Sequence, residues 1–138
     1  MPLTLIVTEG VIPADRQQAT IAHLSATFLQ LHGLAGNKFL TPNVIGHVQV
    51  LPRGSTYSGM HATPLAIVEW KVPSFAFTDR QVQTDYVEKA TQIISEASGG
   101  TLAREQIWVN VTHTVDGPWG IAGKAYTNAE LGSMIGNG

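Results

Sequence analysis

The residue with the most unusual potential chemistry is Pro2, which follows Met1 in the opening stretch MPLTLIV. Methionine before proline is normally removed during synthesis because the second residue is small, and its removal leaves proline with a free secondary amine. A terminal amine titrates near neutrality, at about 7.7–8.0, and burial in an apolar pocket lowers its pKa. A neutral amine can take a proton from the carbon next to a carbonyl and return it elsewhere, or add to the carbonyl as a nucleophile. Pro2 is therefore a candidate general base once Met1 has left.

The same proline also has an architectural interpretation. The stretch PLAIV, which begins at Pro64, repeats the PLTLIV that begins at Pro2. The nitrogen of Pro64 is a tertiary amide without basicity, and the first residue of a strand is a permitted place for proline. The repeat by itself therefore gives Pro2 a role in the fold, and the catalytic role stays a second possibility.

The repeat extends into the elements that must position these residues. Asp15-Arg16-Gln17 returns as Asp79-Arg80-Gln81, and each triplet precedes apolar residues at helical spacing. Pro13 is expected to open the first helix, and Asp79 lies in the expected N-cap region of the second. The pattern predicts two β-α-β units over residues 1–62 and 63–127, followed by a polar, glycine-rich tail from 128 to 138 that we expect to fray. The strands are predicted near 3–7, 43–51, 64–68 and 107–112.

Each unit joins two strands through a helix, which favours a parallel pair with a right-handed crossover. Two units then give one α+β domain, in which a four-stranded mixed sheet carries two helices on one face. The other face of such a sheet is wet unless a second subunit covers it. We therefore expect a homo-oligomer.

Composition excludes several classes of function. A net charge of −2 over 138 residues, without a basic run, argues against nucleic acid and anionic membranes as partners. The absence of cysteine removes disulfides, thiolate catalysis and zinc–thiolate sites, and the histidines lack metal-ligand spacing. No apolar run reaches membrane length, so we expect a soluble cytoplasmic protein without metal or cofactor.

These features together resemble the tautomerase superfamily, over nearly the whole chain. The resemblance implies a catalytic amino-terminal proline at Pro2, two β-α-β units per chain in the longer members, and a homotrimer. Glu9-Gly10 is similar to the end of the first strand in the 4-oxalocrotonate tautomerase branch. The stretch VNVTHTVDGPWGIAG resembles the second strand and hairpin of that branch, which implies a substrate-binding place for Trp119.

Other matches are similar to other branches of the family. LHGLAG, with His32, is similar to the helix end of cis-3-chloroacrylic acid dehalogenase, where the matching histidine is functional. IWVN is similar to that enzyme and to macrophage migration inhibitory factor, which implies active-site roles for Trp108 and Asn110. Lys38 lies close to the active-site lysine of the latter.

The departures from the family pattern concern arginines. Val11 follows Glu-Gly where 4-oxalocrotonate tautomerase has an arginine, and SFAF at 74–77 replaces the arginines of the dehalogenases and of malonate semialdehyde decarboxylase. Lys71 is the nearest cation. Since a carboxylate is best bound by a paired cation, these departures favour an apolar or aromatic substrate with at most one carboxylate.

The resemblance implies a cofactor-independent keto–enol tautomerase that acts on a small 2-oxo acid or an aromatic enol. Two alternatives remain open: a hydratase, dehalogenase or decarboxylase of the same superfamily, and a non-enzymatic trimeric binding protein. The implied binding residues also have structural interpretations. The tryptophans fit a core or an interface, the lysines a solvated surface, and Asn110 a subunit contact. His32 near a helix C-terminus fits a cation favoured by the helix dipole.

Overall fold

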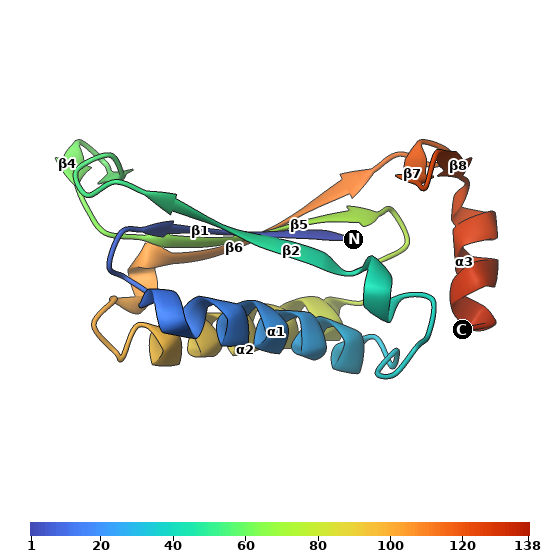
Figure 1. Cartoon of the computed structure of the whole chain (residues 1–138), viewed down its shortest axis with the longest axis horizontal. Coiled ribbons are helices and arrows are strands. Elements are labelled where there is room, and N and C mark those ends of the chain that lie inside the picture. The colour runs from blue at the N-terminus through green and yellow to red at the C-terminus, as the bar shows by residue number, and fades with distance from the viewer.

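The two β-α-β units predicted from the repeat meet at the centre of one sheet. The computed structural model describes every residue from Met1 to Gly138. The strand order is β2-β1-β5-β6, in which β1 is parallel to β2, β5 is parallel to β6, and the two inner strands are antiparallel. Both long helices cover the same face of this sheet, as predicted (Figure 1). The elements of the two units are β1 (Pro2–Thr8), α1 (Ala14–Leu31), β2 (Ile45–Leu51), β5 (Ala66–Pro73), α2 (Arg80–Ala97) and β6 (Ile107–Thr114).

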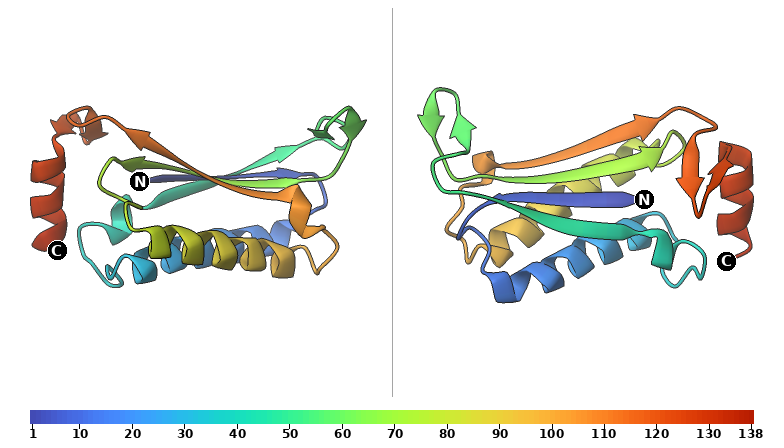
Figure 2. Two further views of the ribbon diagram at one scale, coloured as in Figure 1. Left: turned by 180° about the vertical axis from the view of Figure 1, so that it is seen from behind. Right: turned by 45° about the horizontal axis from the view of Figure 1, so that its top comes forward.

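Smaller elements lie beyond the two ends of the sheet, among them two separate two-stranded hairpins. The hairpin of β3 and β4 lies at one end, and the hairpin of β7 and β8 lies at the other end with helix α3 (Figure 2). Two short 3-10 helices, η1 and η2, precede β2 and β6. None of the helices is long and apolar enough to cross a membrane. These elements are η1 (Thr41–Asn43), β3 (Tyr57–Ser58), β4 (His61–Ala62), η2 (Arg104–Gln106), β7 (Trp119–Ile121), β8 (Lys124–Tyr126) and α3 (Asn128–Gly136).

The long helices begin where the local chemistry predicts. Asp79 precedes α2, and its carboxylate accepts hydrogen bonds from the backbone N–H groups of Gln81 at 2.7 Å and Val82 at 3.1 Å. Helix α1 follows Pro13, whose φ of −55° suits a helix start but whose side chain offers no cap. The two repeated helices therefore start by different means.

The core lies between the helices and the inner strands. Alternate residues of β1 and β5 face the helices, and Leu3, Leu5 and Trp70 are fully buried there. The indole N–H of Trp70 donates to the Tyr86 hydroxyl at 2.6 Å, and that hydroxyl donates to a backbone carbonyl of α1 at 3.3 Å. Burial raises the pKa of Tyr86 well above its usual value. This bonded pair joins the second unit to the first helix.

The other face of the sheet is uncovered in the single chain. The cross-strand register places Ile6, Ile67 and Trp108 side by side on this face. Trp108 is 60% exposed, and Ile45 on the edge strand β2 is 59% exposed. We call this surface the open face.

The segment from 128 to 138 differs from the expected frayed tail. It forms α3, which a capping box starts: the Thr127 hydroxyl accepts from the Glu130 N–H, and the Glu130 carboxylate accepts from the Thr127 N–H. Leu131 and Ile135 are buried on one side of α3. The expectation weighed glycine content and overlooked the Thr-x-x-Glu signal.

Candidate functional site

A pocket opens where β1 begins. Its volume is about 450 Å³, and it lies between the chain start, the junction of η1 with β2, the end of β5 and the β7 hairpin. Most of its exposed wall is apolar. The lining residues are Met1, Pro2, Asn43, Ile45, Lys71, Thr114, Pro118, Trp119, Gly120 and Ile121.

The sheet register places a cation next to Pro2. Pro2 is opposite Ile45 in the parallel pair of β1 and β2. On the other side of β1, Leu3 is opposite Trp70, so Lys71 is the next residue along β5 beside Pro2. Trp70 is buried against the helices, and strand alternation therefore turns Lys71 to the open face, as Pro2 is.

The terminal amine is held in a dry environment. The Met1 amine donates a hydrogen bond to the carbonyl of Asn43, and the Met1 carbonyl accepts from the Ile45 N–H at 3.2 Å. Met1 as a whole is only 5% exposed. Burial lowers the pKa of this amine from 8.0 to about 6, because the charged form loses hydration. A terminal nitrogen in these surroundings is mostly neutral at pH 7.

A tight hairpin turn positions the aromatic wall. Trp119 and Ile121 belong to β7, and the turn to β8 consists of Ala122 and Gly123 alone, since Ile121 pairs with Lys124. Both turn residues have positive φ, 51° and 81°, as a two-residue type I′ turn requires. The turn fixes the register that brings Trp119 to the pocket.

Three of the predicted site residues meet at this pocket: Pro2, Lys71 and Trp119. His32 does not. Its Nδ1 donates to the Phe28 carbonyl at 2.9 Å, and its Nε2 accepts from the Phe77 N–H at 3.3 Å. Burial lowers the pKa of His32, so the neutral ring is favoured over a cation at this helix end. His32 is the C-cap residue of α1, and its ring bonds to the Phe28 carbonyl in the last turn of that helix.

Lys38, Trp108 and Asn110 also lie away from the pocket lining. Lys38 is exposed in the loop that follows α1, whereas Trp108 and Asn110 are exposed on the open face of β6. The single chain does not bring them to the amine. Their roles in binding, like those of the three residues that do meet, stay predictions.

The sequence-based search missed most of the remaining wall. Asn43 and Ile45 lie at the start of the predicted second strand, and parallel pairing with β1 brings them beside Pro2. The strand was predicted, but its register was not, and the register is what reveals them. Thr114, Pro118 and Ile121 depend on how the β7 hairpin folds back, for which the sequence carries only turn signals.

No family model and no curated protein sequence matches this chain. Solved structures do match it. The crystal structure of Pt0534 inactivated by 2-oxo-3-pentynoate superposes with a TM-score of 0.76 at 16% identity, over 96% of this chain and 99% of that one. N1, a member of the cis-3-chloroacrylic acid dehalogenase family, gives 0.74 at 16% identity, over 96% and 90%. A fused 4-OT symmetric trimer gives 0.76 at 14% identity, over 96% and 99%.

The likeness covers 96% of this chain in each of the three comparisons. At these identities the likeness shows a shared backbone fold. It does not show that the side chains of the site are shared. The chain thus has the tautomerase fold in its two-unit form.

Proposed function

We propose that this protein is a cofactor-independent keto–enol tautomerase in which Pro2, once Met1 has been removed, is the general base. The observation that carries the proposal is the pocket at the chain start, which Pro2 lines and in which burial lowers the pKa of the Met1 amine of the unprocessed chain to about 6. Pro2 is the next residue of the chain and lines the same pocket. A base with a pKa near or below neutrality is available in its neutral form at pH 7.

The reaction that this arrangement supports is a proton shift. The neutral Pro2 nitrogen takes a proton from the carbon next to a carbonyl, and the C–H electrons become the double bond of the enolate while the oxygen gains the charge. The protonated amine then returns the proton at the oxygen or at another carbon. Lys71, beside Pro2 in the sheet, supplies a positive charge to a carboxylate or to the developing enolate oxygen.

Removal of Met1 changes the pocket in ways that support this role. Met1 lines the pocket, so its loss enlarges the space in front of Pro2. The same cleavage releases the Asn43 carbonyl and the Ile45 N–H, which bond to Met1 in the unprocessed chain. One acceptor and one donor then become available close to the new terminus.

The lining favours one class of substrate. Lys71 is the only Lys or Arg in the lining, and Ile45, Trp119 and Ile121 contribute apolar walls. One lysine suits one carboxylate, whereas a dicarboxylate calls for paired cations. We therefore propose a 2-oxo acid with an apolar or aromatic tail, for which phenylenolpyruvate is a suitable probe.

The test compares Pro2→Ala with Pro64→Ala. Intact mass first establishes that the purified protein begins at Pro2. We expect Pro2→Ala to lower kcat/KM for phenylenolpyruvate by about 100-fold, within the usual range for a positioned general base. Pro64→Ala alters the repeated proline, whose nitrogen has no basicity, and should leave the rate near that of the parent. Equal rates for the parent and Pro2→Ala would exclude Pro2 as the base.

A dehalogenase is the second candidate, because N1 is among the similar structures. In that chemistry the amine acts protonated, which the lowered amine pKa disfavours, and no arginine lines the pocket. Turnover of 3-haloacrylates in preference to phenylenolpyruvate would favour it. A protein that binds such acids without turning any of them over would be the non-enzymatic binding protein.

A further inference from the structure

Asn37 connects two segments that are far apart in the sequence. Its side-chain amide donates to the Ile135 carbonyl of α3 at 2.7 Å, across 98 positions of the chain. Its side-chain oxygen accepts from the Leu40 N–H at 2.7 Å. Gly138 lies against the same side chain, since a Cβ there would be 2.7 Å from the Asn37 oxygen. One asparagine therefore joins the loop after α1 to the last turn of α3.

The loop that Asn37 holds leads to the terminal amine. Leu40 is 1% exposed, and its carbonyl accepts from the Asn43 N–H at 2.8 Å. The Asn43 side chain donates to the Phe39 carbonyl at 2.7 Å. The Asn43 carbonyl in turn accepts from the terminal amine. The path from α3 to the amine thus consists of short hydrogen bonds and one buried leucine.

Helix α3 is itself fixed at its start, so it can serve as an anchor. The Asn128 N–H donates to the Asp116 carboxylate at 2.6 Å, and the Asn128 amide donates to the Ser74 hydroxyl at 2.8 Å. The capping box adds two further hydrogen bonds, and the side chain of Leu131, a residue of α3, is buried. These contacts attach α3 to the ends of β5 and β6 (Figure 1).

We propose that Asn37 is a positioning residue, which ties the 37–43 loop to α3 and so keeps the Asn43 carbonyl and the water-excluding wall against the terminal amine. The inference rests on the proposed function in that the base is the Pro2 amine, which replaces the Met1 amine as the terminus and lines the same pocket as Asn43. Asn37 is absent from the pocket lining and acts through the loop. In the unprocessed chain, burial lowers the pKa of the Met1 amine. Without the Asn37 bonds the loop loosens and water reaches the terminal amine, so this desolvation weakens and the amine pKa rises.

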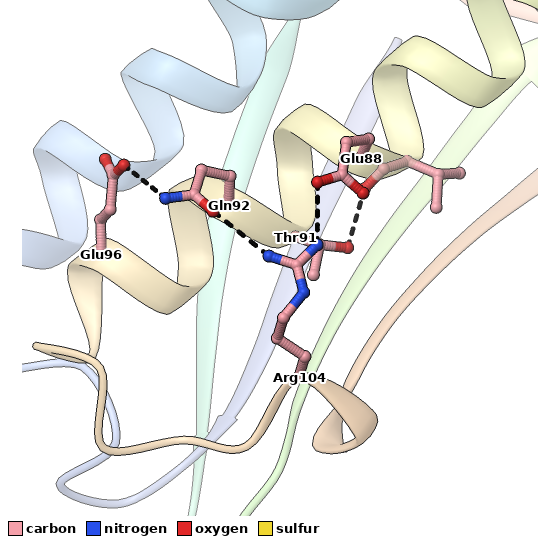
Figure 3. A network of polar contacts seen from close by, with 6 residues as sticks. Glu88, Thr91, Gln92, Glu96 and Arg104 are labelled. Atoms are coloured by element: carbon pink, nitrogen blue, oxygen red, sulfur yellow. Dashed lines mark hydrogen bonds and ion pairs between the residues drawn. The ribbon is translucent and has the colours of Figure 1, made fainter.

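Three variants test the connection. Asn37→Ala removes both bonds. Asn37→Ser keeps an oxygen for the Leu40 N–H, as serine does in such turns, but is too short to reach α3. Gln92→Ala is the matched control: its amide also makes one donor bond, to Glu96 at 2.7 Å, and one acceptor bond, from Arg104 at 3.2 Å (Figure 3). That network lies on α2, outside the pocket.

The primary measurement is the titration of the amine itself. Acetic anhydride labels a neutral terminal amine, and the mass of the amino-terminal peptide after labelling at several pH values gives the midpoint. We expect a higher midpoint in both Asn37 variants and an unchanged midpoint in Gln92→Ala. Thermal unfolding shows which variants are folded at the temperature of labelling, and Asn37→Ser, the milder change, covers the case in which alanine unfolds the chain.

The outcomes separate this inference from the proposed function. A midpoint in Asn37→Ser equal to or below that of the parent overturns the connection to α3, whatever the activity. If Pro2 is also the base, kcat/KM at pH 7 falls by up to about tenfold, since a base with a pKa near 8 is largely protonated there. Shifted midpoints without any turnover of phenylenolpyruvate would support the connection and reject the tautomerase.

Discussion

The chemistry proposed for Pro2 depends on what surrounds one nitrogen. Proline at position 2 is compatible with a simple strand start, and Pro64 occupies the matching place in the second unit. The difference lies in the neighbours: a buried terminus, the Asn43 carbonyl and Lys71 in the adjacent strand. The two prolines thus differ in the chemistry open to them, because only Pro2 can carry a titratable amine.

Lys71 gives a prediction at this scale. Lys71→Met keeps much of the side-chain volume and removes the charge, so we expect KM for phenylenolpyruvate to rise by about tenfold, in line with a lost charge-assisted hydrogen bond of roughly 1.5 kcal/mol. For the parent, kcat/KM should rise with pH and level off once the Pro2 amine has lost its proton, because the base works in its neutral form. Lys89→Met, on the exposed side of α2, is the control. An unchanged KM in Lys71→Met would remove the lysine from the binding site.

At the scale of elements, the two repeated helices have diverged at their starts. Helix α2 has the Asp79 cap, whereas α1 has Pro13 and no side-chain cap. The sequence predicted both starts, since a capping residue and an N-terminal proline are local signals. The expectation of a frayed tail was wrong, because a capping box starts helix α3 despite the glycines in this segment.

The Asp79 cap gives the element-scale prediction. Asp79→Ala leaves two N–H groups of the first turn without their acceptor and should lower the free energy of unfolding by about 1 kcal/mol. Urea unfolding followed by circular dichroism measures the change. Asp85→Ala on the same helix, whose carboxylate accepts only from the Gln81 side chain, should cost about 0.3–0.5 kcal/mol. A larger loss in Asp85→Ala than in Asp79→Ala would contradict the capping role.

For the whole molecule, the main question is what covers the open face. Apolar residues in a row, with Trp108 more than half exposed, are unusual on a monomer's surface. A fused 4-OT of this fold is a symmetric trimer. The homotrimer that the sequence resemblance implies for this chain stays a prediction, and the open face is the surface that it would cover.

Assembly is directly measurable. Light scattering should give a mass of about 44 kDa, three times the chain mass of 14.8 kDa. Trp108→Asp places a charge in the proposed interface and should give the monomer mass, whereas Val87→Asp, on the helix side, should not. A parent protein that is monomeric at micromolar concentration would exclude the trimer.

The sequence by itself determined what is written locally or repeated: two β-α-β units, the mixed sheet with helices on one face, the Asp79 cap, and the candidate amine of Pro2. Tertiary structure alone decided which residues share the pocket. Lys71 and Ile45 come to Pro2 through strand register, and a shift of one residue would turn each to the other face. His32, by contrast, forms hydrogen bonds to the backbone of Phe28 and Phe77. These bonds depend on how the end of α1 packs against a distant loop. Register and packing depend on the whole chain, which is why local patterns did not reveal them.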